Sequence, residues 1–242
     1  MNRSRPKIRG SAAIVLMILC GLLPGMVAAS GDKICDVAAD LALGNEDYPE
    51  AILLHRRLLQ SHPHNALAHY HLGFAYGMMG LKPKEINEYR TSVGLGLRSW
   101  DLFLNLGLAY LDQHQIAQAI HALQTAAELG PEHMETHFNL AIAYESRNRL
   151  VDASREIAIA QRLAPTDPDI ANMSAIIYAK AGDRQRAHQI WQEIARHAPD
   201  YEPAAINLAL LNASGFCDSQ PSSLSEAPCA PARATYHFAP AR

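Results

Sequence analysis

Four histidines lie close together in the segment SHPHNALAHYHLG and are the side chains best suited to metal chemistry. They are His62, His64, His69 and His71. Imidazole nitrogens bind Zn²⁺, Ni²⁺ and Cu²⁺, so a metal-handling protein is one interpretation. His69 and His71 are two residues apart, however, and on a helix they would point about 200° apart. A solvated turn followed by one packed histidine is the interpretation we favour.

Motifs for catalysis are missing from the sequence. It contains no glycine-rich phosphate loop, no GxSxG and no HExxH. Cys35 stands beside Asp32 and Asp36, whereas a nucleophilic thiolate needs a nearby histidine and a positive environment. We therefore predict a protein that is not an enzyme and that needs no cofactor.

The N-terminus has the pattern of an export signal. Arg3, Arg5, Lys7 and Arg9 precede an uncharged stretch, residues 12–29, which ends in small residues. This order predicts a secretory signal peptide over residues 1–29 and a periplasmic or secreted protein. An uncleaved anchor is the alternative, because about 18 apolar residues just suffice to span a bilayer. Contact with the membrane is expected only if the signal stays uncleaved or lipidated.

Cysteines add two questions to this interpretation. Cys20 raises the possibility of lipid attachment, but Leu19 departs from the small residue that lipoprotein signals resembling this one carry before the cysteine. After cleavage Cys35, Cys217 and Cys229 remain. We predict a disulfide between Cys217 and Cys229, which are close in sequence, and a small buried residue at Cys35.

The charge balance argues against nucleic acid as a partner. Without residues 1–29 the chain has 17 basic and 24 acidic residues, although the whole-chain charge is only −3. An acidic protein without basic stripes does not match the phosphate backbone.

A helical pattern that recurs at a fixed interval organises the rest of the chain. In residues 99–133 large apolar residues occur at Phe103, Leu106 and Tyr110, and small or apolar ones follow at Ala119 and Leu123. Shifting the window by about 34 residues reproduces the pattern. The unit resembles the tetratricopeptide repeat, a helix–turn–helix of about 34 residues.

The resemblance implies an all-α fold, a right-handed α-solenoid of stacked repeats with a C-terminal capping helix. The expected repeats are 32–65, 66–99, 100–133, 134–167 and 168–201, followed by a capping helix over 202–212. Small residues at positions 8 and 20 of each repeat let its two helices approach closely, and a bulky residue at position 24 fills the space beside them. The Ser-, Ala- and Pro-rich residues 213–242 predict a disordered tail.

Two repeats depart from this pattern. The second has Glu85 at position 20, where a small residue is expected. The first has His55 at position 24 and Ala42 in place of the aromatic residue at position 11, which makes it the weakest match of the five.

The resemblance also implies where a partner would bind. In this family the first helices line a concave surface through positions 5, 9 and 12, and members that grip acidic C-termini use Lys at 5 and Asn at 9. Here both positions are mostly apolar in repeats two to five. The expected partner-binding residues are Tyr70, Phe74, Leu104, Leu108, Phe138, Ile142 and Ile176. They predict an apolar or helical ligand, unless neighbouring helices cover them.

The favoured function is therefore a protein-interaction scaffold or adaptor for an unknown protein partner. It is similar to exported repeat proteins that serve envelope, pilus or cytochrome assembly. The alternatives are the metal-handling protein of the histidine cluster and a self-assembling oligomer, built by end-to-end stacking or by a disulfide through Cys35.

Overall fold

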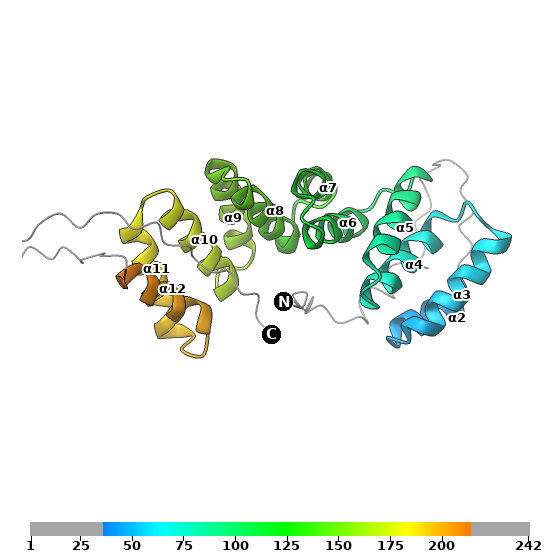
Figure 1. Ribbon diagram of the computed structural model, residues 1–242, viewed down its shortest axis with the longest axis horizontal. Helices are drawn as coiled ribbons and strands as arrows, with labels where there is room; N and C mark the ends of the chain where they lie inside the picture. Colours follow the sequence, from blue (N-terminus) through cyan, green and yellow to red (C-terminus); the bar gives the residue numbers. More distant parts are fainter. Residues whose placement is uncertain (1–35, 214–242) are drawn as a thin grey trace, which may run out of the picture. The chain divides into compact units, whose positions relative to one another are not determined.

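The computed structural model describes residues 36–213, which form α-helices joined by short turns, without a strand in that range (Figure 1). These residues belong to two compact units, and each is treated by itself below. We call residues 36–131 the N-terminal unit and residues 132–213 the C-terminal unit. The predictions for the signal peptide, for Cys35, for a Cys217–Cys229 disulfide and for a tail after Ala213 all concern residues outside the described range.

Consecutive helices pair as antiparallel hairpins in both units. The N-terminal unit contains α2 (Val37–Gly44), α3 (Tyr48–Ser61), α4 (Ala66–Met78), α5 (Lys82–Gly94), α6 (Trp100–Asp112) and α7 (Ile116–Leu129). The C-terminal unit contains α8 (Met134–Ser146), α9 (Leu150–Leu163), α10 (Pro168–Lys180), α11 (Arg184–His197) and α12 (Glu202–Ala213). From α4 onward each first helix begins at the start of a predicted repeat, and the all-α repeat fold predicted from the sequence is confirmed.

The local sequence explains where the helices begin and how the hairpins turn. Asp36, Asn65 and Asp183 cap α2, α4 and α11, each accepting a hydrogen bond from a backbone N–H of the first turn. Between the two helices of every hairpin, position 15 has a left-handed backbone. The residues there are Glu46, Gly80, His114, Asn148 and Gly182, with φ between 56° and 95°. One left-handed residue after a helix end lets the chain reverse within a short turn.

Glycines at position 8 bring the two helices of a hairpin into contact. A Cβ atom on Gly107 would lie 2.6 Å from Cγ of Leu123, and one on Gly73 would lie 2.7 Å from the ring of Tyr89. Both partners occupy position 24 and are fully buried. The sequence rule that pairs a small residue at 8 with a bulky one at 24 therefore describes this packing.

The departure at Glu85 is accommodated within the second hairpin. Its side chain is fully buried, and its carboxylate occupies the space beside Gly77, where a Cβ atom would lie only 2.4 Å from Oε1. Nζ of Lys82, one turn earlier, lies 3.6 Å from Oε2 of Glu85 and 2.6 Å from Asp112. A nearby cation thus offsets part of the cost of burying this carboxylate.

The C-terminal unit ends in α12, which covers the apolar side of the last hairpin. Ala204 and Leu211 are fully buried and pack in one cluster with Ala175 and Trp191. This arrangement is what a capping helix provides for a stack of repeats. Among residues 36–213, no helix combines the length and the apolar character that a membrane crossing requires.

Candidate functional site

Position 5 of the first helices is largely interior. Tyr70 and Leu104 in the N-terminal unit are buried, and Asn172 in the C-terminal unit is completely so. The next first helix, α6, covers Tyr70: its Oη donates to Asp101 Oδ2 at 2.8 Å and accepts from Asn105 Nδ2 at 3.1 Å. Burial, and then the charge of Asp101, raise the pKa of Tyr70 well above its ordinary value. Side chains at position 5 therefore join neighbouring repeats.

Side-chain hydrogen bonds also join successive first helices in the C-terminal unit. Asn207 Nδ2 donates to Asn172 Oδ1 at 3.0 Å, and Trp191 Nε1 donates to the same oxygen at 2.8 Å. Tyr201 Oη donates to Asp169 Oδ1 at 2.7 Å. Burial raises the pKa of Asp169, although this hydrogen bond acts in the opposite direction.

The predicted apolar ladder reaches the surface at position 9 of repeats two to four and at position 5 of the fourth repeat. Of the seven predicted binding residues, Tyr70, Leu104 and Ile176 are buried, so they are not available to a ligand in this conformation. The other four are half-buried: Phe74, Leu108, Phe138 and Ile142. In the N-terminal unit the accessible residues are Phe74 on α4 and Leu108 on α6. The ring of Tyr48 contacts that of Phe74 edge-on, with the ring centroids 6.5 Å apart.

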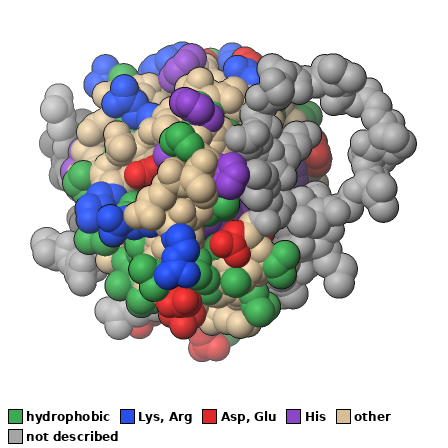
Figure 2. Space-filling view, turned by 90° about the vertical axis from the view of Figure 1, so that its right-hand side faces the viewer, with side chains coloured by type: hydrophobic (Ala, Val, Ile, Leu, Met, Phe, Trp, Pro, Cys, Tyr) green, Lys and Arg blue, Asp and Glu red, His purple; other side chains and the backbone are tan. Residues whose placement is uncertain are grey.

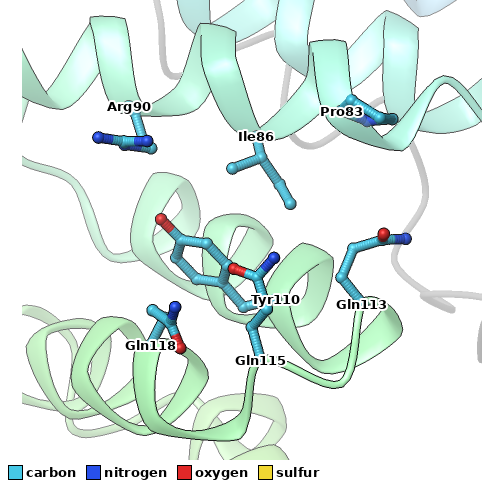
Figure 3. A pocket seen from close by; sticks show the side chains of 7 residues that line it. All are labelled: Pro83, Ile86, Arg90, Tyr110, Gln113, Gln115 and Gln118. Atoms are coloured by element: carbon cyan, nitrogen blue, oxygen red, sulfur yellow. The ribbon is translucent and has the colours of Figure 1, made fainter.

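A groove of about 480 Å³ lies between α5 and the α6–α7 hairpin (Figure 3). Its lining residues are Pro83, Ile86, Arg90, Tyr110, Gln113, Gln115 and Gln118. Amide, phenol and guanidinium groups can hydrogen-bond to a polar chain, but this lining holds no carboxylate, thiol or imidazole that would act as nucleophile or base.

The four histidines considered as an alternative metal site do not come together as one set of ligands among the described residues. His64 is exposed, and His62 Nδ1 lies 2.9 Å from Oγ of Ser61. The remaining two point to different partners, as their spacing on α4 requires: His69 Nδ1 contacts Glu88 at 2.6 Å, and His71 Nδ1 contacts Asp40 at 2.8 Å.

His69 occupies position 4 as a packed histidine with its own acidic partner. Burial lowers the pKa of His69, but the hydrogen bond with Glu88, the contact with the carbonyl oxygen of Pro63 and the charge of Glu88 outweigh it and leave the pKa raised. The fourth repeat has the same pair, His137 and Glu156, 2.8 Å apart. A glutamate at position 23 thus fixes a histidine at position 4 within one hairpin.

A different acidic and imidazole cluster forms around His71. Oδ1 of Asp40 on α2 lies 2.8 Å from His71 Nδ1 on α4 and 4.0 Å from His55 Nε2 on α3. Sequence reasoning missed Asp40 and His55 because they are far from the visible histidine run. Alignment of the repeats could have identified them, because Asp40 and His55 stand at positions where the other repeats have apolar residues.

Comparison with known proteins agrees with the geometry. The tetratricopeptide repeat family model matches residues 37–77 and 104–168. Comparison by sequence with curated proteins finds no match. Among solved structures, YrrB, a tetratricopeptide repeat protein with an unusual peptide-binding site, is 21% identical with a TM-score of 0.66, over 69% of this chain and 87% of its own.

Two further structures show the same likeness. MamA is 21% identical with a TM-score of 0.63, over 70% of this chain and 98% of its own. A MamA fragment from Desulfovibrio magneticus is 14% identical with a TM-score of 0.63, over 68% and 93%. At these identities the likeness concerns the fold.

The stacked hairpins define a class of repeat protein whose fold serves protein–protein interaction. Within that class, residues 37–77 and 104–168 match the tetratricopeptide repeat family, and the fold is the one that YrrB, a tetratricopeptide repeat protein, also has.

Proposed function

We propose that the protein is a non-enzymatic, extracytoplasmic scaffold that binds an apolar or helix-forming segment of another protein along position 9 of its first helices. The single observation that carries this proposal is that Phe74 and Leu108, equivalent apolar residues on the contacting first helices α4 and α6, are both half-buried. Position 5, where a charged clamp would be needed, has no charged side chain in repeats two to five. Amphipathic helices bind such surfaces through residues spaced by three and four.

Two other observations support parts of the proposal. The structure of YrrB is described as having a peptide-binding site, which is the same class of ligand. The basic and then uncharged residues 1–29 favour export, so the partner is expected among envelope or secreted proteins, including those that assemble pili, cytochromes or the envelope. Intact mass of the exported chain tests this directly, because a mature start near Ser30 or Gly31 without an acyl group is expected.

Affinity capture from the envelope fraction tests the binding surface. The wild-type chain and the double variant Phe74→Asp/Leu108→Asp serve as baits. We expect the variant to lose at least about 90% of the partner recovered by the wild type, because two charges would be desolvated in an apolar contact. Recovery by the wild type should persist at high salt, since the contact is apolar.

Leu53→Asp is the matched control, because Leu53 is an apolar residue of the same unit that is 53% exposed on a second helix. It should capture as the wild type does. Circular dichroism checks that the double variant stays helical. If it unfolds, a photo-crosslinking amino acid at position 108 or 53 of the otherwise unchanged chain replaces it. Adducts formed equally at both positions, or unchanged capture by a folded double variant, would place the binding site elsewhere.

A further inference from the structure

Asp40, His55 and His71 converge from three helices of the N-terminal unit. One potential ligand atom from each lies within 4.8 Å of the other two. The two imidazole rings meet edge-on, with their centroids 5.3 Å apart. Figure 2 looks onto the side of the N-terminal unit that carries α2 and α3, where histidine side chains appear among charged and hydrophobic ones. Within residues 36–213, these three are the histidine, cysteine, aspartate or glutamate side chains that lie close enough together to share one metal ion.

The repeat register shows that packing alone does not require these residue types. At position 24, where the first repeat has His55, the other repeats have Tyr89, Leu123, Ile157 and Trp191, all buried. At position 9, where the first repeat has Asp40, the equivalent residues are Phe74, Leu108, Ile142, Ile176 and Leu210. The first repeat therefore replaces two apolar side chains with metal-binding ones, and the fold places both against His71.

His55 is a buried imidazole without a hydrogen-bond partner. Its side chain is 1% exposed, and neither ring nitrogen is hydrogen-bonded within the described part of the chain. The nearest acidic oxygen, Oδ1 of Asp40, is 4.0 Å away, which is too far for a hydrogen bond. Native proteins rarely leave such a group unsatisfied without a functional reason or a bound ion.

From this geometry we infer that Asp40, His55 and His71 form a binding site for one divalent transition-metal ion of the Zn²⁺ type. Two imidazole nitrogens and a carboxylate oxygen suit Zn²⁺, whereas Ca²⁺ and Mg²⁺ take oxygen ligands. The ion bonds to Nε2 of His55, the ring nitrogen that faces Asp40, to Nδ1 of His71 and to a carboxylate oxygen of Asp40. The proton of the His71–Asp40 hydrogen bond leaves Nδ1 for Nε2 of the same ring or for solvent. This inference is independent of the proposed binding surface at Phe74 and Leu108.

The surroundings of the three side chains agree with this assignment. Asp40 keeps 20% of its side chain exposed, which gives an ion access from solvent, while His71 is nearly enclosed. Tetrahedral metal–ligand bonds of about 2.0–2.2 Å place the ligand atoms about 3.4 Å apart. His55 Nε2, 4.0 Å from Oδ1 of Asp40, must therefore move slightly closer, and the 2.8 Å contact between Asp40 and His71 must open slightly.

Such a site links the first repeat to the second. α2 and α3 form the first hairpin and α4 begins the next, so one ion would fasten the hairpin whose sequence fits the repeat pattern least well. The ion therefore stabilises the N-terminal end of the array by binding the folded state.

The test is a Zn²⁺ titration of the tag-free mature chain, stripped with a chelator and kept reduced, against a competing chromophoric chelator. We expect one ion per chain. Replacing Zn²⁺ with Co²⁺ should give visible ligand-field bands without a thiolate charge-transfer band, because the ligands are nitrogen and oxygen. The thermal midpoint of the wild type should rise with Zn²⁺.

Two variants copy the residues that other repeats use. His55→Leu and Asp40→Leu should each weaken Zn²⁺ binding by about 100-fold or more, since each removes a ligand. Their thermal midpoints should no longer respond to Zn²⁺. With chelator present and no metal bound, His55→Leu should be at least as stable as the wild type. Loss of Zn²⁺ binding in this variant could then not be attributed to unfolding.

His62→Ala/His64→Ala is the control and should bind as the wild type does. Loss of binding in this control would assign the ion to the inter-repeat turn. The inference is overturned by that result, by a wild-type chain that takes up no stoichiometric ion, by a thiolate band in the Co²⁺ spectrum, or by unchanged binding in His55→Leu and Asp40→Leu.

Discussion

Two neighbouring repeats each bury a polar side chain where the repeat pattern has a small or apolar one. The surroundings of the two side chains differ. In the second repeat, buried Glu85 has Lys82 one turn away on the same helix, with Nζ 3.6 Å from its carboxylate. Gly77 on the facing helix provides the space. In the first repeat, buried His55 finds no partner on its own helix, and Asp40 remains 4.0 Å away.

The difference shows how a polar residue becomes tolerable in a repeat core. A partner three residues earlier is fixed by the helix itself, so the Glu85 position is complete within one hairpin. The polar groups near His55 come from α2 and α4. A bound ion could contact Asp40, His55 and His71 together and so satisfy the buried imidazole. The first arrangement serves packing, whereas the second suits binding.

The largest effect is expected from moving the imidazole into an apolar position. Leu123→His puts histidine at position 24 of the third repeat, where Leu123 is fully buried. We expect a loss of about 2–5 kcal/mol in the free energy of unfolding, because apolar contacts are lost and an imidazole is buried without a partner. Urea unfolding measures it.

Leu129→His is the matched control, since Leu129 lies on the same helix and is 39% exposed. It should change stability by no more than about 0.5 kcal/mol. If Leu123→His were as stable as the wild type, position 24 would accept any histidine, and the contrast between the two repeats would lose its meaning.

The helix pattern was predictable because it depends on local rules. Small residues at position 8, such as Gly107, and bulky ones at position 24, such as Leu123, indicated which helices pack together. Exposure was less predictable. Tyr70 was expected on a binding surface, but the next first helix, α6, covers it. A family position number does not say how closely successive helices approach.

The cluster at Asp40 shows a second limit of sequence reasoning. Its members come from three successive helices, α2, α3 and α4, so nothing in a local window of the sequence connects them. Closeness in sequence instead suggested the histidines at 62–71, which helix geometry separates. The comparison of equivalent positions across repeats is the signal that could have identified Asp40 and His55.

A smaller effect is expected from the space shared by Gly77 and Glu85. Gly77→Ala should cost about 1–3 kcal/mol, because its Cβ would lie 2.4–2.9 Å from the atoms of a fully buried carboxylate. In a Glu85→Ala background the same change should be neutral or stabilising by up to about 1 kcal/mol, since alanine favours a helix over glycine.

A double-mutant cycle by urea unfolding isolates this coupling, expected at about 1–3 kcal/mol. Gly94→Ala is the control, because nothing lies within 4 Å of a Cβ at that position. Additive effects of Gly77→Ala and Glu85→Ala would show that the carboxylate does not occupy the space beside Gly77.

The smallest effect is expected where Lys82 meets its second carboxylate. Asp112→Asn removes an oxygen 2.6 Å from Nζ of Lys82, yet 35% of the Asp112 side chain is exposed and water competes for the contact. Exposed pairs typically contribute about 0.2–1 kcal/mol, and Lys82 keeps Glu85 as a partner, so we expect a loss near the lower end of that range. The loss should shrink further at high salt. Urea unfolding at low and high salt measures both. A loss well above about 1 kcal/mol that persists at high salt would mean that Asp112 helps to stabilise the buried Glu85 through Lys82. The surroundings of Glu85 would then include a second hairpin, as those of His55 do.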